Sequence, residues 1–85
     1  MPLSRSELKR ALKHLQANEW QPAHEIVQQD EDSPLACWAH GIVHLMEGDL
    51  PNARYWYKQA KRAFPEKPDG QAETEALGRA LDQKS

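Results

Sequence analysis

The sequence predicts an all-α fold in which consecutive helices pack as antiparallel neighbours. Apolar residues recur at helical spacing along the whole chain, and no segment shows the strict alternation of a half-buried strand. The predicted loops are short, which makes sequential helices antiparallel neighbours. Because 85 residues leave room for one core only, we expect a single domain over residues 1–85.

The first helix is predicted from its start signals and its apolar face. Ser4 and Glu7 have the spacing of a capping box. Leu3 and Leu8 are placed to pack against each other as a hydrophobic staple. Asn18 tolerates a left-handed backbone, so we expect the helix to end there. The apolar face consists of Leu8, Ala11, Leu12 and Leu15.

A second helix follows, with Pro22 in its first turn, where the missing N–H costs little. The acidic run 30–32 interrupts the helical pattern and predicts a loop. Ser33 and Pro34 then suit the N-cap and first position of a third helix, which we expect to run to about Glu47.

The third and fourth helices are separated by a predicted tight turn. Gly48 suits a left-handed helix end, and Asp49 suits the N-cap of the fourth helix. We expect the fourth helix to run to Phe64, with Pro65 as its stop. A fifth helix is predicted over about residues 71–83, with one apolar side made of Ala72, Ala76, Leu77, Ala80 and Leu81.

The chain also carries an internal repeat. A shift of 30 residues aligns the first two predicted helices with the third and fourth. The aligned pairs include His14 with His44, Leu15 with Leu45, Ala23 with Ala53, and Asn18 with Gly48. The pairing of Asn with Gly preserves a residue that tolerates a left-handed helix end. Turn chemistry and small-residue positions therefore agree between the two halves.

A spaced set of small and aromatic residues lies in the second half: Gly41, His44, Ala53, Tyr57, Ala60 and Pro65. This set resembles the tetratricopeptide repeat (TPR) pattern, which reads W-x2-L-G-x2-Y, then A-x3-F, then P. The third helix departs from that pattern, since Cys37, His40 and His44 occupy the slots of Trp, Leu and Tyr. A part of the chain is also similar to small bacterial proteins of unassigned function.

The resemblance to the TPR family covers about residues 5–65. It implies two antiparallel helix hairpins over 4–31 and 33–65, with a C-terminal capping helix over 69–83. It also implies a concave groove that holds a peptide or a helix. An apolar stripe would line this groove, flanked by the charges of Arg54 and Lys58. Its residues would be Leu8, Leu12, Leu35, Trp38, Ile42 and Met46. The alternative is that the fifth helix fills the stripe as core.

Four side chains of metal-ligand type share one face of the third helix: Cys37, His40, His44 and Glu47. In a line they span about 15 Å, so they cannot all reach one ion. Only His40 with His44, at i and i+4, could chelate together, and a structural zinc site needs two further ligands. His14 or His24 could supply one of them. We expect packing or surface histidines, no metal and no cofactor, with a His40–His44 metal site as the alternative.

Nucleophilic catalysis has little support in the sequence. Cys37 lies one helical turn before His40, but no third group that would orient the pair is evident. A thiol in a packing position is usually inert. We therefore expect a protein that is not an enzyme.

Charge and composition restrict the partners. A net charge of −2 gives no basic excess for nucleic acid, and no apolar run approaches the ~20 residues that span a bilayer. The N-terminus lacks the apolar stretch of a secretion signal. The lone Cys37 suits a reducing compartment, so we expect a cytoplasmic protein.

These observations lead to a non-enzymatic module that binds a protein or peptide through the groove. They do not favour nucleic acid or membrane partners. The alternative from another class is a self-associating homodimer, because helix-pair arrays usually need three or more repeats and this chain offers two and one helix. A metal-binding protein that uses His40 and His44 is the third possibility.

Overall fold

The computed structural model describes residues 2–82. Five helices form in this part of the chain: α1 (Arg5–Gln16), α2 (Trp20–Val27), α3 (Pro34–Glu47), α4 (Leu50–Gln59) and α5 (Gly70–Asp82). Residues 2–82 contain no strand, which confirms the all-α prediction. The expected end of the last helix, residue 83, lies outside the described residues.

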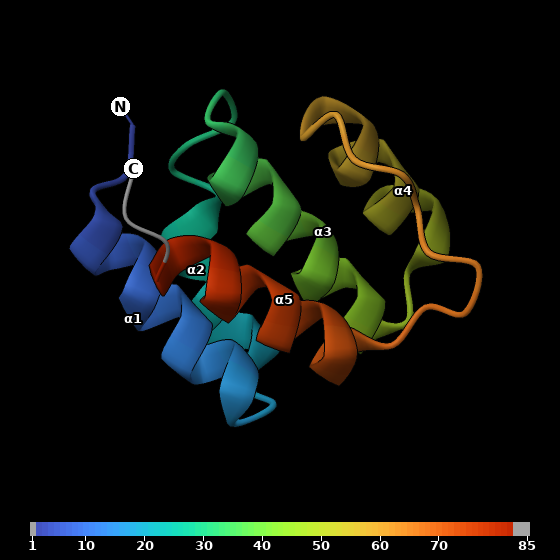
Figure 1. Cartoon of the computed structure of the whole chain (residues 1–85), viewed down its shortest axis with the longest axis horizontal. Helices are drawn as coiled ribbons and strands as arrows, with labels where there is room; N and C mark the ends of the chain where they lie inside the picture. Colours follow the sequence, from blue (N-terminus) through green and yellow to red (C-terminus); the bar gives the residue numbers. More distant parts are fainter. Residues whose placement is uncertain (1, 83–85) are drawn as a thin grey trace.

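Helix α3 is the centre of the fold. It contacts each of the other four helices, whereas the backbone of α4 lies close to that of α3 alone. Figure 1 shows α5 lying along α1 and α3, with α4 displaced to the far side of α3. Because α3 is covered on several sides, it buries an unbroken run of residues from 36 to 44. Within the described chain, no helix is both long enough and apolar enough to cross a membrane.

The predicted helix starts are confirmed for α1 and α4. The Ser4 hydroxyl accepts the N–H of Glu7, and the Glu7 carboxylate accepts the N–H of Ser4, each at 3.1 Å. This reciprocal pair is the predicted capping box. At α4, the Asp49 carboxylate accepts the N–H of Asn52 at 3.3 Å. Both caps satisfy backbone donors that the first helical turn leaves without partners.

The start of α3 is organised by Asp30 instead of by the side chain of Ser33. Asp30 is only 2% exposed, and its carboxylate accepts the N–H groups of Leu3, Asp32 and Ser33 at 2.9–3.0 Å. Burial by itself would raise the pKa of Asp30. The hydrogen bonds from Ser33, Leu3 and Asp32 outweigh this effect and lower the pKa to about 2. Asp30 thus ties the chain start to the loop before α3.

Two helix ends share one backbone geometry 30 residues apart. Asn18 after α1 and Gly48 after α3 have φ values of 61° and 89°, which confirms both predicted left-handed ends. The N–H of Glu19 donates to the carbonyl of His14 at 2.8 Å, and the N–H of Asp49 donates to the carbonyl of His44 at 2.9 Å. The turns that join α1 to α2 and α3 to α4 are therefore equivalent.

The predicted end of the fourth helix at Phe64 is wrong, because α4 ends at Gln59. Lys61 adopts a left-handed backbone with φ 59°, and the N–H of Arg62 turns back to the carbonyl of Tyr57 at 3.0 Å. This closure is of the same kind as the two glycine- or asparagine-marked ends. Since lysine seldom takes this conformation, the residue type gave no signal for it. Residues 62–69 then lead to α5 without forming a helix.

Candidate functional site

The stripe predicted to bind a partner lies beneath α5. Its buried members are Leu8, Leu12, Trp38 and Ile42, and its half-buried members are Leu35 and Met46. Helix α5 contacts both α1 and α3 and buries its own Leu77 and Leu81 there. The approach is close, since a Cβ built on Gly70 would lie 2.9 Å from Cγ of Met46. The contacts of α5 with Leu12, Trp38 and Met46 favour the alternative in which the fifth helix fills this stripe.

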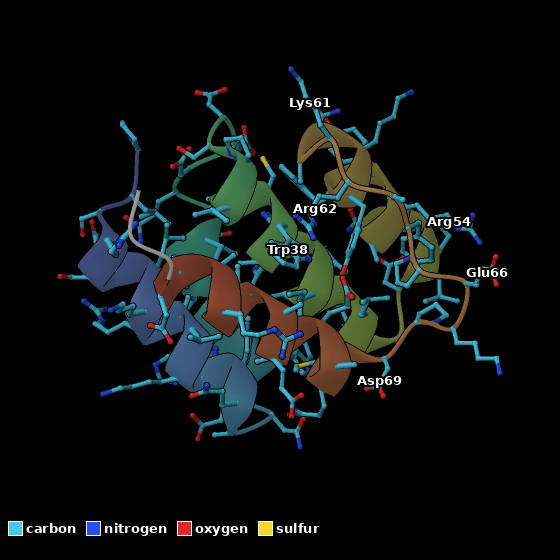
Figure 2. All side chains as sticks on the ribbon, in the orientation of Figure 1. Trp38, Arg54, Lys61, Arg62, Glu66 and Asp69 are labelled. Carbon is cyan, nitrogen blue, oxygen red and sulfur yellow. The ribbon has the colours of Figure 1, made fainter. Side chains whose placement is uncertain are left out.

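Polar contacts fix α5 over Trp38. One oxygen of Glu73 accepts the indole N–H of Trp38 at 3.1 Å and the hydroxyl of Tyr57 at 2.6 Å. The guanidinium carbon of Arg62 lies 3.5 Å from the centroid of the Trp38 ring, and Figure 2 shows these two side chains together. The polar atoms of both buried aromatic side chains therefore have partners.

The predicted flanking charges lie on the exposed side of α4. Arg54 and Lys58 are both exposed, and Arg54 places its guanidinium 4.7 Å from the ring centroid of Phe64. Helix α4 reaches α5 through Tyr57, which donates to Glu73, and Arg54 and Lys58 do not take part in that contact. These cations thus belong to the surface of α4 rather than to the helix that covers the stripe.

A cluster of three histidines, His24, His40 and His44, lies between α2 and α3. One ring nitrogen from each lies within 4.8 Å of those of the other two. The ring centroids are 4.9–5.4 Å apart. The sequence paired His40 with His44 and left the third ligand open between His14 and His24. The structure brings His24 to the pair, whereas His14 contacts Glu19 at 2.9 Å on the other turn.

The histidine cluster is largely removed from water. His40 and His44 are buried and His24 is half-buried. The His40 ring stacks on Trp56 with centroids 3.9 Å apart, and its Nδ1 is a buried nitrogen without a hydrogen-bond partner. Burial, with the neighbouring His24 and His44, lowers the pKa of His40 to about 3. His40 is therefore neutral at pH 7, which is the form of histidine that binds metal ions.

A carboxylate orients one ring of the histidine cluster. The Nδ1 of His44 lies 2.7 Å from a carboxylate oxygen of Glu47. Glu47 can only accept, so His44 donates from Nδ1 and leaves Nε2 free as a ligand atom. Histidines that bind metals commonly donate their second N–H to a carboxylate in this way, which fixes the tautomer and the ring orientation.

The other predicted ligand on this helix face, Cys37, is separate from the histidine cluster. Its thiol donates to the backbone carbonyl of Glu31 at 3.3 Å. Burial raises the pKa of the Cys37 thiol, and the acidic side chains of residues 30–32 raise it further. Cys37 is therefore held as a neutral thiol, away from the reactive thiolate form.

One further group of ligand type shares His44. It consists of His44, Glu47 and Asp49, whose ligand atoms also lie within 4.8 Å of one another. Both carboxylates of this group already accept hydrogen bonds within the fold. Glu47 accepts from His44, and Asp49 caps α4. Any experiment on the histidine cluster must separate these two groups.

No family model, curated protein or solved structure matches this chain. The likeness to the TPR family therefore stays a prediction, carried by the residues quoted above and by the equivalence of the two turns.

Proposed function

We propose that the protein binds one divalent transition-metal ion of the zinc class, held by His24, His40 and His44. The observation that supports this is the meeting of three imidazole nitrogens within 4.8 Å in a largely buried seam. Ligand atoms about 2.0 Å from a tetrahedral ion lie about 3.3 Å apart, so the rings need to close by about 1.5 Å at most. Imidazole suits zinc, copper and nickel.

An ion also gives a physical reason for keeping a histidine at position 40. A buried nitrogen without a partner costs about 1–3 kcal/mol, and an apolar side chain would avoid that cost. The Nδ1 of His40 is such a nitrogen. Ligation at this atom would satisfy it, which pure packing does not.

The proposal is tested by zinc titration of tag-free protein, followed by calorimetry. We expect one ion per chain and a loss of affinity of at least about tenfold in His24→Gln, because one of three ligands is removed. The chain has four histidines, so His14→Gln is the matched control and should bind as the wild type does. Asp49→Asn should also bind normally, which separates the histidine cluster from the acidic group. Absence of zinc binding, or equal losses in the His14 and His24 variants, would sink the proposal.

A paramagnetic ion provides a second readout. Because Trp56 stacks on His40 at 3.9 Å, bound Co²⁺ should quench its fluorescence. The quenching should shrink in Trp56→Phe, which retains Trp20 and Trp38. Quenching of the same size in both proteins would place the ion elsewhere.

We place this metal-binding protein among non-enzymatic proteins of a reducing compartment such as the cytoplasm. The absence of enzymatic activity is supported by the state of Cys37, the candidate nucleophile in the sequence. Its thiol is buried and hydrogen-bonded to a carbonyl. The reducing compartment is supported by Cys37 being a free cysteine.

A second candidate function is the binding of an acidic protein segment on α4. The observation that favours it is Tyr55, which is 54% exposed and lies in sequence next to Arg54 and one turn before Lys58. Tyrosine and arginine are both enriched in protein interfaces, and Lys58 adds a positive charge that suits an acidic segment. The covered stripe would have to lose α5 before it could take a partner, whereas this face is already open.

The second function is tested with a fluorescent Glu-rich peptide and anisotropy. Binding should weaken several-fold in Lys58→Glu and remain unchanged in Lys13→Glu on α1. Equal weakening by both would indicate only general charge attraction, and tighter binding of an oligonucleotide would contradict the protein-segment proposal. Light scattering on the same samples tests the homodimer alternative, which predicts a mass twice that of the chain.

A further inference from the structure

The histidine cluster supplies three ligands, whereas an ion of the zinc class takes four. Among the His, Cys, Asp and Glu side chains of residues 2–82, no fourth one joins His24, His40 and His44 at the same mutual distance. Zinc sites with three protein ligands keep the fourth position for water or for a molecule from solution, unlike closed structural sites.

The two other ligand-type side chains that share this face of α3, Cys37 and Glu47, have hydrogen-bond partners. The thiol of Cys37 faces the carbonyl of Glu31 at 3.3 Å. Glu47 holds the Nδ1–H of His44 at 2.7 Å, and this bond is the one that frees Nε2 for an ion. On the His40 side the neighbour is the indole of Trp56, stacked nearly parallel at 10°. An indole offers only an N–H donor, so Trp56 can pack beside the ion but cannot bind it.

The cluster is accessible from one side. His40 and His44 are buried on α3, whereas His24 on α2 is half-buried. An ion and a further ligand would therefore reach the site from the side of His24, the cluster member that keeps partial exposure.

Charge determines which ligand fits. Neutral imidazoles leave the whole double charge on the ion, in contrast to sites in which thiolates neutralise it. Burial beside Trp56 lowers the local dielectric and strengthens attraction to an anion. The Glu47 carboxylate contacts the Nδ1 of His44, and one carboxylate offsets a double charge only in part.

We propose that the ion bound by His24, His40 and His44 keeps an open fourth position that takes one small monodentate anion from solution. This inference rests on the metal-binding function proposed above. It adds the ligand class of the site, because a closed structural ion would have no such position.

The experiment loads tag-free protein with Co²⁺ and adds azide while the visible absorption is recorded. We expect the Co²⁺ bands to shift in a saturable way, with one azide per ion, and His14→Gln to behave identically. His24→Gln should lose the bands, and circular dichroism establishes that this variant is folded. If His24→Gln does not fold, Trp56→Phe, which keeps all three ligands, must still show the azide shift.

The possible failures are distinguishable. No Co²⁺ bands at any concentration would overturn the metal site itself, and the anion position with it. Strong bands that azide does not change, even at a hundredfold excess over the ion, would overturn the open position and leave the metal site standing. If the mass also doubles on loading, the fourth ligand comes from a second copy of the chain, which again overturns the anion proposal.

Discussion

The two sides of α3 differ in how their polar groups are satisfied. On the side under α5, Trp38 and Tyr57 both donate to Glu73. On the side facing α2, His40 keeps a buried nitrogen without a partner. Burial does not separate the two regions, since Trp38 is 1% and His40 is 4% exposed.

We infer from this difference where the core ends and the proposed site begins. A buried polar group that is fully hydrogen-bonded belongs to the stabilising framework, whereas one left unpaired calls for an explanation such as ion binding. The α5 side is closed by the chain itself, and the histidine side has spare ligand capacity. The following substitutions test this contrast.

The largest effect is expected for Trp38→Ala. If α5 covers the stripe, removal of this buried side chain should lower the free energy of unfolding by about 3–5 kcal/mol. Urea denaturation measures this loss. Tyr55→Ala, at an exposed aromatic position, should change stability by less than about 0.5 kcal/mol. Similar small losses in both variants would show that the stripe is open rather than core.

Glu73→Ala should have the second largest effect. It leaves the indole N–H of Trp38 and the hydroxyl of Tyr57 without their acceptor, so we expect a loss of about 2–3 kcal/mol. Glu75→Ala is the matched control, because Glu75 is exposed on the same helix. Thermal unfolding of the two variants side by side gives the comparison. Equal melting temperatures would mean that Glu73 does not hold α5.

Asp30 provides a pH test of a second satisfied polar group. Its folded pKa of about 2 lies below its ordinary 3.8, so the unfolded chain takes up the proton first as pH falls. The contribution of the ionised Asp30 to the free energy of unfolding is complete above about pH 5. It decreases by about 2 kcal/mol as the pH falls toward 2. The difference in stability between wild type and Asp30→Asn should therefore narrow by that amount over this window. A difference that stays constant with pH would contradict the role given to the carboxylate.

Among the buried positions tested, the smallest effect on stability is expected for His40→Leu. Leucine removes the unpaired nitrogen, so the metal-free protein should unfold within about 1 kcal/mol of wild type in spite of the lost stacking on Trp56. Zinc binding should fall at least about tenfold in the same variant. A large destabilisation with unchanged zinc affinity would make His40 a core residue and reverse the contrast between the two sides of α3.

The sequence predicted the features that depend on one residue and its neighbours. The capping box at Ser4, the Asp49 cap and the left-handed ends at Asn18 and Gly48 follow from residue type alone. The end of α4 could not be predicted from residue type. The left-handed residue there is Lys61, and its conformation is stabilised by the surrounding structure rather than by its own preference.

The candidate site was only partly predictable. The i, i+4 spacing placed His40 and His44 on one helix face, but the third partner depends on how α2 rotates against α3, which local spacing does not fix. His14 and His24 were therefore equal candidates. Trp56 could not be placed at the site from the sequence, because its stack on His40 is a contact between two helices and leaves no local pattern.

The most direct test of the account is a crystal of the tag-free protein soaked in zinc, with anomalous diffraction recorded at the zinc edge. The account predicts one strong peak about 2.0–2.1 Å from a nitrogen of each of His24, His40 and His44, with the Nδ1 of His44 still bonded to Glu47. A peak bound instead by Glu47 and Asp49, or no peak at the three histidines, would contradict it.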